Sequence, residues 1–456
     1  MNPSSLRELG VDLLNEQQFE RALAVLAEAA RRCPSDHQAR VLAARCFAGL
    51  GEKERAVITL QACAEGLLRR GYLLSAIAAC KRAQELSANE KRVQETLLRI
   101  HARAIPTAPG KASVPPPLPP EILYDGKVSE DLMALGGQSL SDKSIEVLAA
   151  PDPGEPSGDE GRALPLFVDL DAEPFVQLVS TMGYRTYRAG EAIAMQGQGG
   201  DSIFVIVSGE AQVARQSDAR ERILGYLRGG SIFGVIALFT GAPPSVTVVA
   251  REETEVFEIR REHLNSIAKN FPNVPHALAE FAQRRMARNL IGTSPLLQQV
   301  DGSERAALLS RFRFRALQPH EITLVEGQHS PGLFLVLAGE LVVQKEDPAG
   351  GVVSLGFLRE GDIAGEISLL TGLRATATVV ATRKTAAAYM DRAAFDELIR
   401  DYPQMKNYLE ALSQRRLKQI GEALRPEEII DADELLVDAE AAERAPPPAK
   451  ASPAAP

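Results

Sequence analysis

The stretch "GEISLLTGLRATATVV", residues 365–380, contains a glycine, a carboxylate and a guanidinium within ten residues. Gly365 precedes a short apolar run, Glu366 follows it directly, and Arg374 comes before a run of β-branched residues. Backbone N–H groups at the start of a helix attract anions, and a guanidinium forms charge-assisted hydrogen bonds with phosphate. The pattern of strand, glycine, short helix and strand therefore predicts a phosphate cradle.

The elements that would position this cradle occur twice, because the chain contains a tandem repeat. Residues 165–290 and 295–421 match at an offset of 130, which becomes 131 after one inserted residue. "VSGEAQV" matches "LAGELVV", and "LGYLRGGSIFG" matches "LGFLREGDIAG". Short runs of β-branched residues between glycine-bearing turns predict an antiparallel barrel or jelly roll, and helical periodicity closes each copy. We expect two copies of one β-roll domain.

Both copies resemble the cyclic nucleotide-binding domain family. The residues that carry the resemblance are the "SGE" and "AGE" hairpin turns and the segments "FGVIALFTG" and "AGEISLLTG". The resemblance implies a cassette in which the backbone after a glycine and an arginine about ten residues later hold the phosphate. It also implies that a glutamate after the glycine accepts a hydrogen bond from the ribose 2'-hydroxyl.

The second copy keeps most of this cassette. The family's proline and arginine positions are occupied by Arg374 and Ala375, so the guanidinium stands one residue early, and neighbouring residues of an extended segment point to opposite sides. Thr376 stands where a hydroxyl residue of the family is associated with a guanine base. We expect a weakened site for cyclic AMP or cyclic GMP; the alternative is that Glu366 is a solvated first-turn carboxylate and Arg374 an exposed loop cation. The candidate ligand-binding residues are Gly365, Glu366, Ile367, Ser368, Arg374, Ala375 and Thr376.

The first copy departs further from the family pattern. Gly234 is kept, but Val235 replaces the carboxylate and Pro244 stands at the arginine position. We therefore expect this degenerate copy to serve as a structural or interaction domain, open to a different ligand or a protein segment.

Residues 1–104 predict amphipathic helices with short breaks. In "LGVDLLNEQQFERALAVLAEAARRCP", small and apolar residues stand at the offsets of a tetratricopeptide repeat, and Ala56 follows Ala22 by one period of 34 residues. A third copy, "SAIAACKRAQEL", arrives early. The region resembles a short tetratricopeptide array that would recruit a protein partner; a generic bundle of helical hairpins is the alternative.

Composition separates these domains. Residues 105–164 are rich in proline, glycine, serine and acids, which predicts a disordered linker. Residues 425–456 begin with "EEIIDADELLVDAEAAE", an acidic helix or solvated segment that could dock on a partner, and end in an alanine- and proline-rich tail. The expected fold is multidomain α + β: helical repeats over 1–104, then antiparallel β-roll (jelly-roll) domains over 165–291 and 292–424, each closed by C-terminal helices.

Charge and motif content exclude several functions. The net charge of -9 provides no basic field for nucleic acid, so no DNA partner is expected. The patterns H-E-x-x-H, G-x-S-x-G and G-x-x-x-x-G-K-S/T are absent, and the four cysteines and six histidines lack metal-ligand spacing, which predicts no enzyme and no metal. No apolar run approaches the ~18 residues that a membrane span needs, and the N-terminus lacks a secretory h-region, so a cytoplasmic location is expected.

These patterns lead to two hypotheses about function. The first is a non-enzymatic signalling protein that senses a cyclic nucleotide weakly in its second β-roll and recruits a protein partner through its helical repeats. The second is a ligand-independent scaffold with two pseudo-receptor β-rolls. The sequence predicts no oligomeric state.

Overall fold

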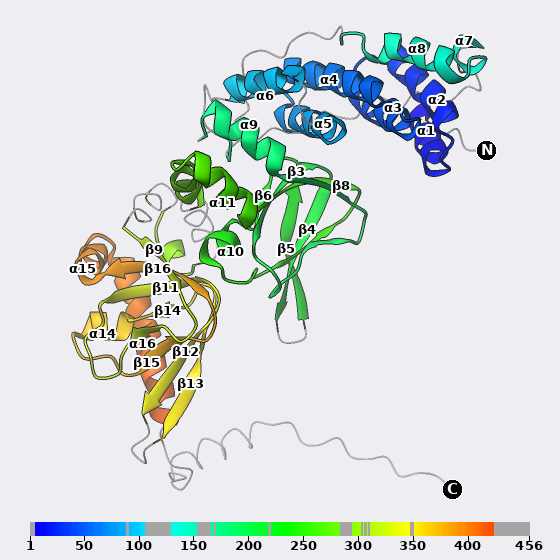
Figure 1. Ribbon diagram of the computed structural model, residues 1–456. Coiled ribbons are helices and arrows are strands. Elements are labelled where there is room, and N and C mark those ends of the chain that lie inside the picture. The colour runs from blue at the N-terminus through cyan, green and yellow to red at the C-terminus, as the bar shows by residue number, and fades with distance from the viewer. Residues whose placement is uncertain are drawn as a thin grey trace, which may run out of the picture.

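A helical region, a first β-roll and a second β-roll follow one another along the chain in the computed structural model (Figure 1). The predicted multidomain α + β class is confirmed. The predicted acidic helix and tail, and most of the predicted linker, lie outside the described residues. The structure describes residues 5–87, 91–104, 128, 130–152, 166–167, 170–217, 220–282, 294–301, 304, 308, 311–346 and 351–423.

Six helices form the N-terminal region, and each packs against its neighbour in sequence. Close packing needs small residues between them: a Cβ added to Gly10 would lie 2.5 Å from Leu26, and Ala22 and Ala56 are fully buried. Whether the helices are tetratricopeptide repeats stays a prediction. The helices are α1 (Leu6–Asn15), α2 (Phe19–Arg32), α3 (His37–Gly49), α4 (Lys53–Arg69), α5 (Leu73–Leu86) and α6 (Lys91–Ala104).

Part of the predicted linker forms helices that dock on this region. Helices α7 (Glu130–Met133) and α8 (Gly137–Leu148) pack against α2, and α8 also contacts α3 and α4 (Figure 1). The buried guanidinium of Arg40 donates to the carbonyl oxygens of Leu148 and Ala150 at 3.0 and 2.8 Å. These bonds attach the end of α8 to the helical region, so the chain between residues 130 and 152 is part of it.

The first roll consists of two four-stranded antiparallel sheets, ordered β1-β8-β3-β6 and β2-β7-β4-β5. Helix α9 precedes the strands, α10 lies between β6 and β7, and α11 follows β8. The elements are α9 (Ala172–Thr181), β1 (Gly183–Tyr187), β2 (Ala192–Ala194), β3 (Ser202–Ser208), β4 (Glu210–Ser217), β5 (Arg220–Arg228), β6 (Ile232–Phe233), α10 (Val235–Thr240), β7 (Thr247–Ala250), β8 (Thr254–Arg260) and α11 (Arg261–Asn270).

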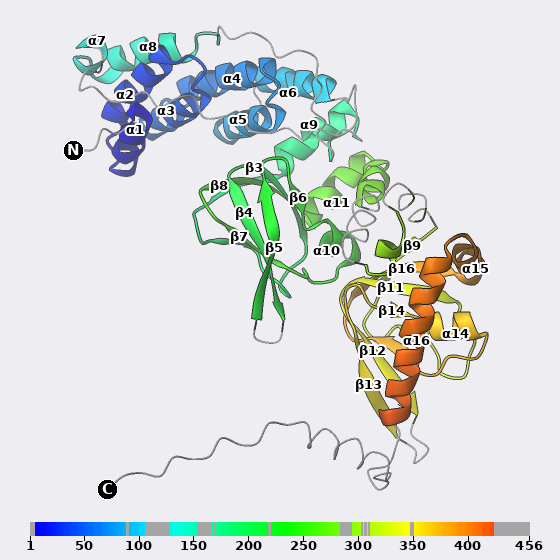
Figure 2. The same ribbon diagram turned by 180° about the vertical axis from the view of Figure 1, so that it is seen from behind.

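The second roll repeats this topology with sheets ordered β9-β16-β11-β14 and β10-β15-β12-β13. Helix α14 occupies the place of α10, and the long helix α16 closes the domain (Figure 2). The elements are η1 (Leu297–Gln299), β9 (Arg313–Leu317), β10 (Ile322–Leu324), β11 (Gly332–Ala338), β12 (Leu341–Glu346), β13 (Val352–Leu358), β14 (Ile363–Ala364), α14 (Glu366–Thr371), β15 (Thr378–Ala381), β16 (Thr385–Asp391), α15 (Arg392–Asp401) and α16 (Pro403–Ala423).

Two kinds of apolar core stabilise this arrangement. The inner face of each roll encloses its own cluster, around Ile206 and Val256 in the first roll and around Phe334 and Val336 in the second. A third cluster runs from α1 through the first roll to α16. The three regions are therefore joined by a continuous apolar core as well as by the chain.

Polar contacts reinforce both junctions. Arg82 of α5 donates to the Tyr184 hydroxyl at 2.8 Å and to Glu255 at 2.7 Å, which attaches the helical region to the first roll. Arg215 of β4 pairs with Glu360 of the second roll at 2.6 Å. Burial raises the pKa of the Glu360 carboxyl, and the charge of Arg215 opposes that shift. The first roll thus contacts a different neighbour on each side.

The cysteines are free thiols, and the described helices are not membrane spans. Cys46, Cys63 and Cys80 are buried and Cys33 is half-buried, and none is in a disulfide. Burial raises the pKa of the Cys46 and Cys63 thiols to about 12, so both stay protonated. Among the described helices, none is long and apolar enough to span a bilayer.

Candidate functional site

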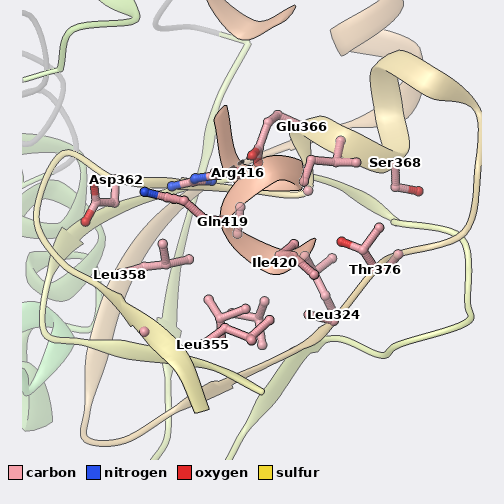
Figure 3. A pocket seen from close by; sticks show the side chains of 18 of the residues that line it. Leu324, Leu355, Leu358, Asp362, Glu366, Ser368, Thr376, Arg416, Gln419 and Ile420 are labelled. Carbon is pink, nitrogen blue, oxygen red and sulfur yellow. Dashed lines mark hydrogen bonds and ion pairs between the residues drawn. The ribbon is translucent and has the colours of Figure 1, made fainter. Parts of the chain in front are cut away.

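A pocket of about 250 Å³ lies in the second roll, between β13, the cassette around α14 and the end of α16. Its wall is mostly apolar, with Leu324, Leu355 and Leu358 facing a smaller set of polar groups (Figure 3). Small-molecule sites usually combine such a wall with a few convergent polar groups. The polar and charged side chains at the pocket are Asp362, Glu366, Ser368, Thr376, Arg416 and Gln419.

Gly365 positions the cassette because its backbone adopts a left-handed conformation. Its φ is +94°, and a Cβ at this position would lie 2.4 Å from the carbonyl oxygen of Gly332. Only glycine fits both conditions, and α14 begins directly after this turn. The turn places Glu366 on the pocket wall with 1% of its surface exposed.

Glu366 does not lie in solvent, as the alternative interpretation of the sequence expected. Its Oε1 accepts a hydrogen bond from Arg416 of α16 at 2.7 Å, and the same guanidinium nitrogen donates to the carbonyl oxygen of Ile363 at 2.6 Å. A buried carboxylate needs such a partner to offset its desolvation. The ion pair therefore attaches the closing helix to the cassette at the pocket (Figure 3).

The guanidinium that the sequence placed one residue early points elsewhere. Arg374 is exposed and donates to the carbonyl oxygen of Gly327 at 2.9 Å, and it is not among the residues that line the pocket. Ala375, which stands at the family's arginine position, is buried and lines the pocket, as does Thr376. Because side chains alternate along this segment, the methyl group of Ala375 lies at the pocket where the family has its arginine.

Two other cassette residues, Ser368 and Ile367, also line the pocket. The Ser368 hydroxyl accepts from the backbone N–H of Ser330 at 3.2 Å and donates to the carbonyl oxygen of Leu373 at 2.6 Å. Ile367 contributes apolar surface. Ser368 therefore fixes the loop that follows α14.

Lys345 fixes the strand segment that carries Thr376. Its ammonium group donates to the carbonyl oxygen of Thr376 at 3.0 Å and pairs with Glu326. Burial alone would raise the pKa of Glu326, but the hydrogen bonds from Lys345 and the Glu346 backbone, with the charge of Lys345, together hold that pKa below its usual 4.5. The positive charge of Lys345 is thus balanced outside the pocket.

The corresponding region of the first roll holds a cavity of about 390 Å³. Gly234 has a φ of +82°, and a Cβ there would lie 2.3 Å from the carbonyl oxygen of Ser202, so this glycine is required by the same turn. Val235 is buried, and Pro244 lines the cavity together with the stacked rings of Phe204 and Phe233. The wall is apolar where the second roll carries its ion pair.

Among the described residues that line the first roll's cavity, one is charged, and it has a partner. Asp201 pairs with Arg261 at 3.1 Å. In the described parts of both rolls, no three histidine, cysteine, aspartate or glutamate side chains gather to hold a metal ion. The two pockets therefore differ mainly in the charged groups of their walls.

The structure brings most of the predicted residues together. Gly365, Glu366, Ile367, Ser368, Ala375 and Thr376 all line one pocket, and Arg374 does not. Arg416 was not predicted as part of the site. A signal for it existed, because "QRR" recurs at equivalent positions of the two copies, but on sequence alone a basic helix end reads as complementing the helix dipole.

Comparison with known proteins agrees with this geometry. Residues 184–271 and 314–402 each match the cyclic nucleotide-binding domain family. The chain is 27% identical over 236 residues to a cAMP-dependent protein kinase regulatory subunit of Blastocladiella emersonii, which covers 51% of this chain and 56% of that protein. A protein of the same name from Dictyostelium discoideum is 27% identical over 247 residues, covering 53% of this chain and 72% of its own. The chain thus spans little more than half the length of the first of these relatives.

Similar solved structures include the regulatory domain of Toxoplasma gondii PKA with cAMP, at 22% identity, 55% coverage of this chain, 92% coverage of that chain and a TM-score of 0.28. A regulatory subunit of a cAMP-independent protein kinase A from Trypanosoma brucei is 19% identical, covers 57% of this chain and 92% of its own, and also has a TM-score of 0.28. The chain consists of a helical region followed by two β-rolls, and each roll contains a segment that matches the cyclic nucleotide-binding domain family.

Proposed function

We propose that this protein is a cytoplasmic, non-enzymatic regulatory protein that senses a ribose-bearing ligand of the cyclic nucleotide class in its second roll. Binding of cyclic AMP or cyclic GMP would be weak, because the position of the family's phosphate arginine holds Ala375. The helical region would recruit the protein partner that receives the signal. The relatives' names, which describe regulatory subunits of a kinase, support the regulatory part of this proposal.

The observation that carries the proposal is the buried carboxylate of Glu366 in a pocket that α16 covers. A ribose hydroxyl that donates to the second oxygen of this carboxylate would share Glu366 with Arg416, which attaches α16 to the cassette. Ligand binding would therefore shift α16 between two positions, and a partner would detect that change.

Calorimetric titration of the full chain with cyclic AMP, cyclic GMP and cyclic di-GMP tests the sensing claim. We expect heat that saturates below millimolar ligand for one of the first two. A Glu366→Gln variant, which keeps the size of the side chain and removes its charge, should bind about tenfold or more weakly. No heat from any of these ligands at millimolar concentration would contradict the proposal as far as cyclic nucleotides are concerned.

A ligand-independent scaffold is the second candidate, and one observation favours it. The charged groups of the second cassette are already satisfied within the protein, since Glu366 pairs with Arg416 and Arg374 with a backbone carbonyl. For a scaffold, the double variant Glu366→Ala and Arg374→Ala would bind the partner as the wild type does, with and without nucleotide. For a sensor, nucleotide would change partner binding by the wild type and not by the variant.

A further inference from the structure

The charges that line the pocket of the second roll do not suit an anion. Among the described lining residues, Asp362 and Glu366 are acidic and Arg416 is the one cation. The Arg416 guanidinium is held by Glu366 and by the carbonyl oxygen of Ile363, so its charge is already balanced. The formal charge of the wall is therefore -1, and a phosphate that entered would add a second negative charge in a partly desolvated space.

Three described cations close to the lining residues but outside the pocket are engaged as well. Arg374 donates to Gly327 on the outer surface, and Lys345 pairs with Glu326. The backbone N–H of Arg359 donates to Asp362 at 2.8 Å, while the guanidinium of Arg359 pairs with Glu340. Each of these groups would have to break a bond and turn before it could meet a phosphate.

The remaining groups of the pocket suit a ligand without charge. One carboxylate oxygen of Glu366 carries the bond from Arg416, so the other can accept from a sugar hydroxyl. The leucine wall and Ile420 offer a flat base an apolar surface, and Thr376 lies at the same pocket with its hydroxyl. The volume of about 250 Å³ lies just below the usual range for drug-sized ligands, which favours the smaller of two related ligands.

We infer that the pocket of the second roll selects an uncharged nucleoside over the cyclic phosphate of the same nucleoside. This inference rests on the proposed function, because it takes the pocket as the site of a ribose-bearing ligand and names the class of that ligand. The sugar hydroxyl would be recognised by Glu366, and Ala375 would contact the position where the phosphate of a cyclic nucleotide would lie.

Matched pairs of ligands isolate the phosphate. Guanosine with cyclic GMP, and adenosine with cyclic AMP, differ only by that group, and each would be titrated calorimetrically into the full chain. We expect the nucleoside of at least one pair to bind about tenfold or more tightly than its cyclic phosphate, the cost of an unmatched charged group. A cyclic phosphate that binds as tightly as its nucleoside, or more tightly, overturns the inference and leaves the proposed function intact. If none of the four binds, both fail.

A gain-of-function variant tests the same point from the opposite side. Ala375→Arg places a guanidinium at the pocket position that lacks one, and it should reduce the preference for the nucleoside within a pair by improving the binding of the cyclic phosphate about tenfold. Ala375→Gln is the control of similar length without charge and should leave the preference unchanged. A folded Ala375→Arg protein with unchanged preference overturns the inference; if this variant does not fold, the wild-type titrations decide alone.

Discussion

The two rolls share a topology, a left-handed glycine at the same turn and a short helix after it, yet their pockets differ in kind. In the second roll, the buried Glu366 forms an ion pair with Arg416 of the closing helix. In the first, Val235 joins the apolar core, and α10 packs against β9 and β16 of the second roll. The glycine is kept because the backbone requires it, whereas the carboxylate is kept only where a partner exists. Retention of the glycine alone is therefore no evidence for a ligand.

The largest effect on stability is expected from exchanging the residue that follows the glycine in each roll. Val235→Glu buries a carboxylate inside an apolar cluster and should lower the free energy of unfolding by about 3–5 kcal/mol. Glu366→Val should cost about 1–2 kcal/mol, because the remaining guanidinium of Arg416 is 21% exposed and can be hydrated. Urea denaturation followed by circular dichroism measures both. Val235→Gln introduces an uncharged side chain about the size of glutamate, and its cost should lie between those of the other two variants. Equal costs for Val235→Glu and Glu366→Val would contradict the difference that we assign to the two rolls.

Substitution of the glycine itself tests the left-handed turn that the two rolls share. Gly234→Ala and Gly365→Ala should each cost about 2–4 kcal/mol, since each combines a left-handed backbone with a carbonyl oxygen that the new Cβ would meet. Gly327→Ala is the matched control with a φ of +79° and open space around it, and should cost only about 1–2 kcal/mol. Thermal unfolding gives the ranking. If Gly365→Ala were no worse than Gly327→Ala, the close approach to Gly332 would not constrain the turn.

Two arginines of the second roll, Arg416 and Arg374, distinguish the ligand pocket from the outer surface of the roll. Arg416→Ala should weaken ligand binding about tenfold, or about 1.4 kcal/mol, because Glu366 loses the group that orients it. Arg374→Ala should change affinity less than about twofold, since the side chain lies on Gly327 outside the pocket. Calorimetry with guanosine and cyclic GMP measures both. A tenfold loss of cyclic GMP binding in Arg374→Ala would show that this arginine reaches the phosphate, as the sequence predicted.

The smallest expected effect is a loss of stability at low pH, and it should be similar in both rolls. The hydrogen bond from Arg228 lowers the pKa of Glu210 below 4.5. Burial opposes the same shift at Glu340, where the hydrogen bonds from Arg359 and Thr382 and the charges of the neighbouring arginines together outweigh it. Since the folded pKa values lie below the unfolded ones, their stabilisation is present above about pH 4.5 and is lost as the pH falls through the folded values. The melting difference between wild type and Glu210→Gln or Glu340→Gln should shrink from pH 6 to pH 3. A difference that grows on acidification would reverse the assigned direction.

The repeat made the rolls predictable, since an alignment of the chain on itself located equivalent turns, strands and cassettes. The glycine and the carboxylate could be located from the sequence because they are adjacent and stand at a turn that the repeat aligns in both copies. Arg416 did not, because it reaches Glu366 from a helix 50 residues away, and no local pattern distinguishes such a residue from a solvated helix end. The orientation of Arg374 also required the structure: alternation along a strand indicates opposite sides but does not show which side faces the pocket.

Helix α8 is a second feature that could not be predicted from the sequence. Its segment is polar enough to predict disorder, yet Leu140 and Leu148 lie on one face and are buried against the helical region. Two apolar positions per helix are a weak signal unless the receiving surface is known. The buried Arg40, which holds the end of this helix through two carbonyl oxygens, belongs to that surface.

The apolar cluster that runs from α1 to α16 has a consequence for how the chain can be divided. Each roll encloses a private core, but its outer face contributes to the shared cluster. A fragment cut between the rolls would expose that face, including the side of α10 that contacts β9 and β16. Calorimetric melting of the whole chain would then be more cooperative than the sum of its excised parts, and a change at one end would be transmitted mechanically rather than across a flexible joint.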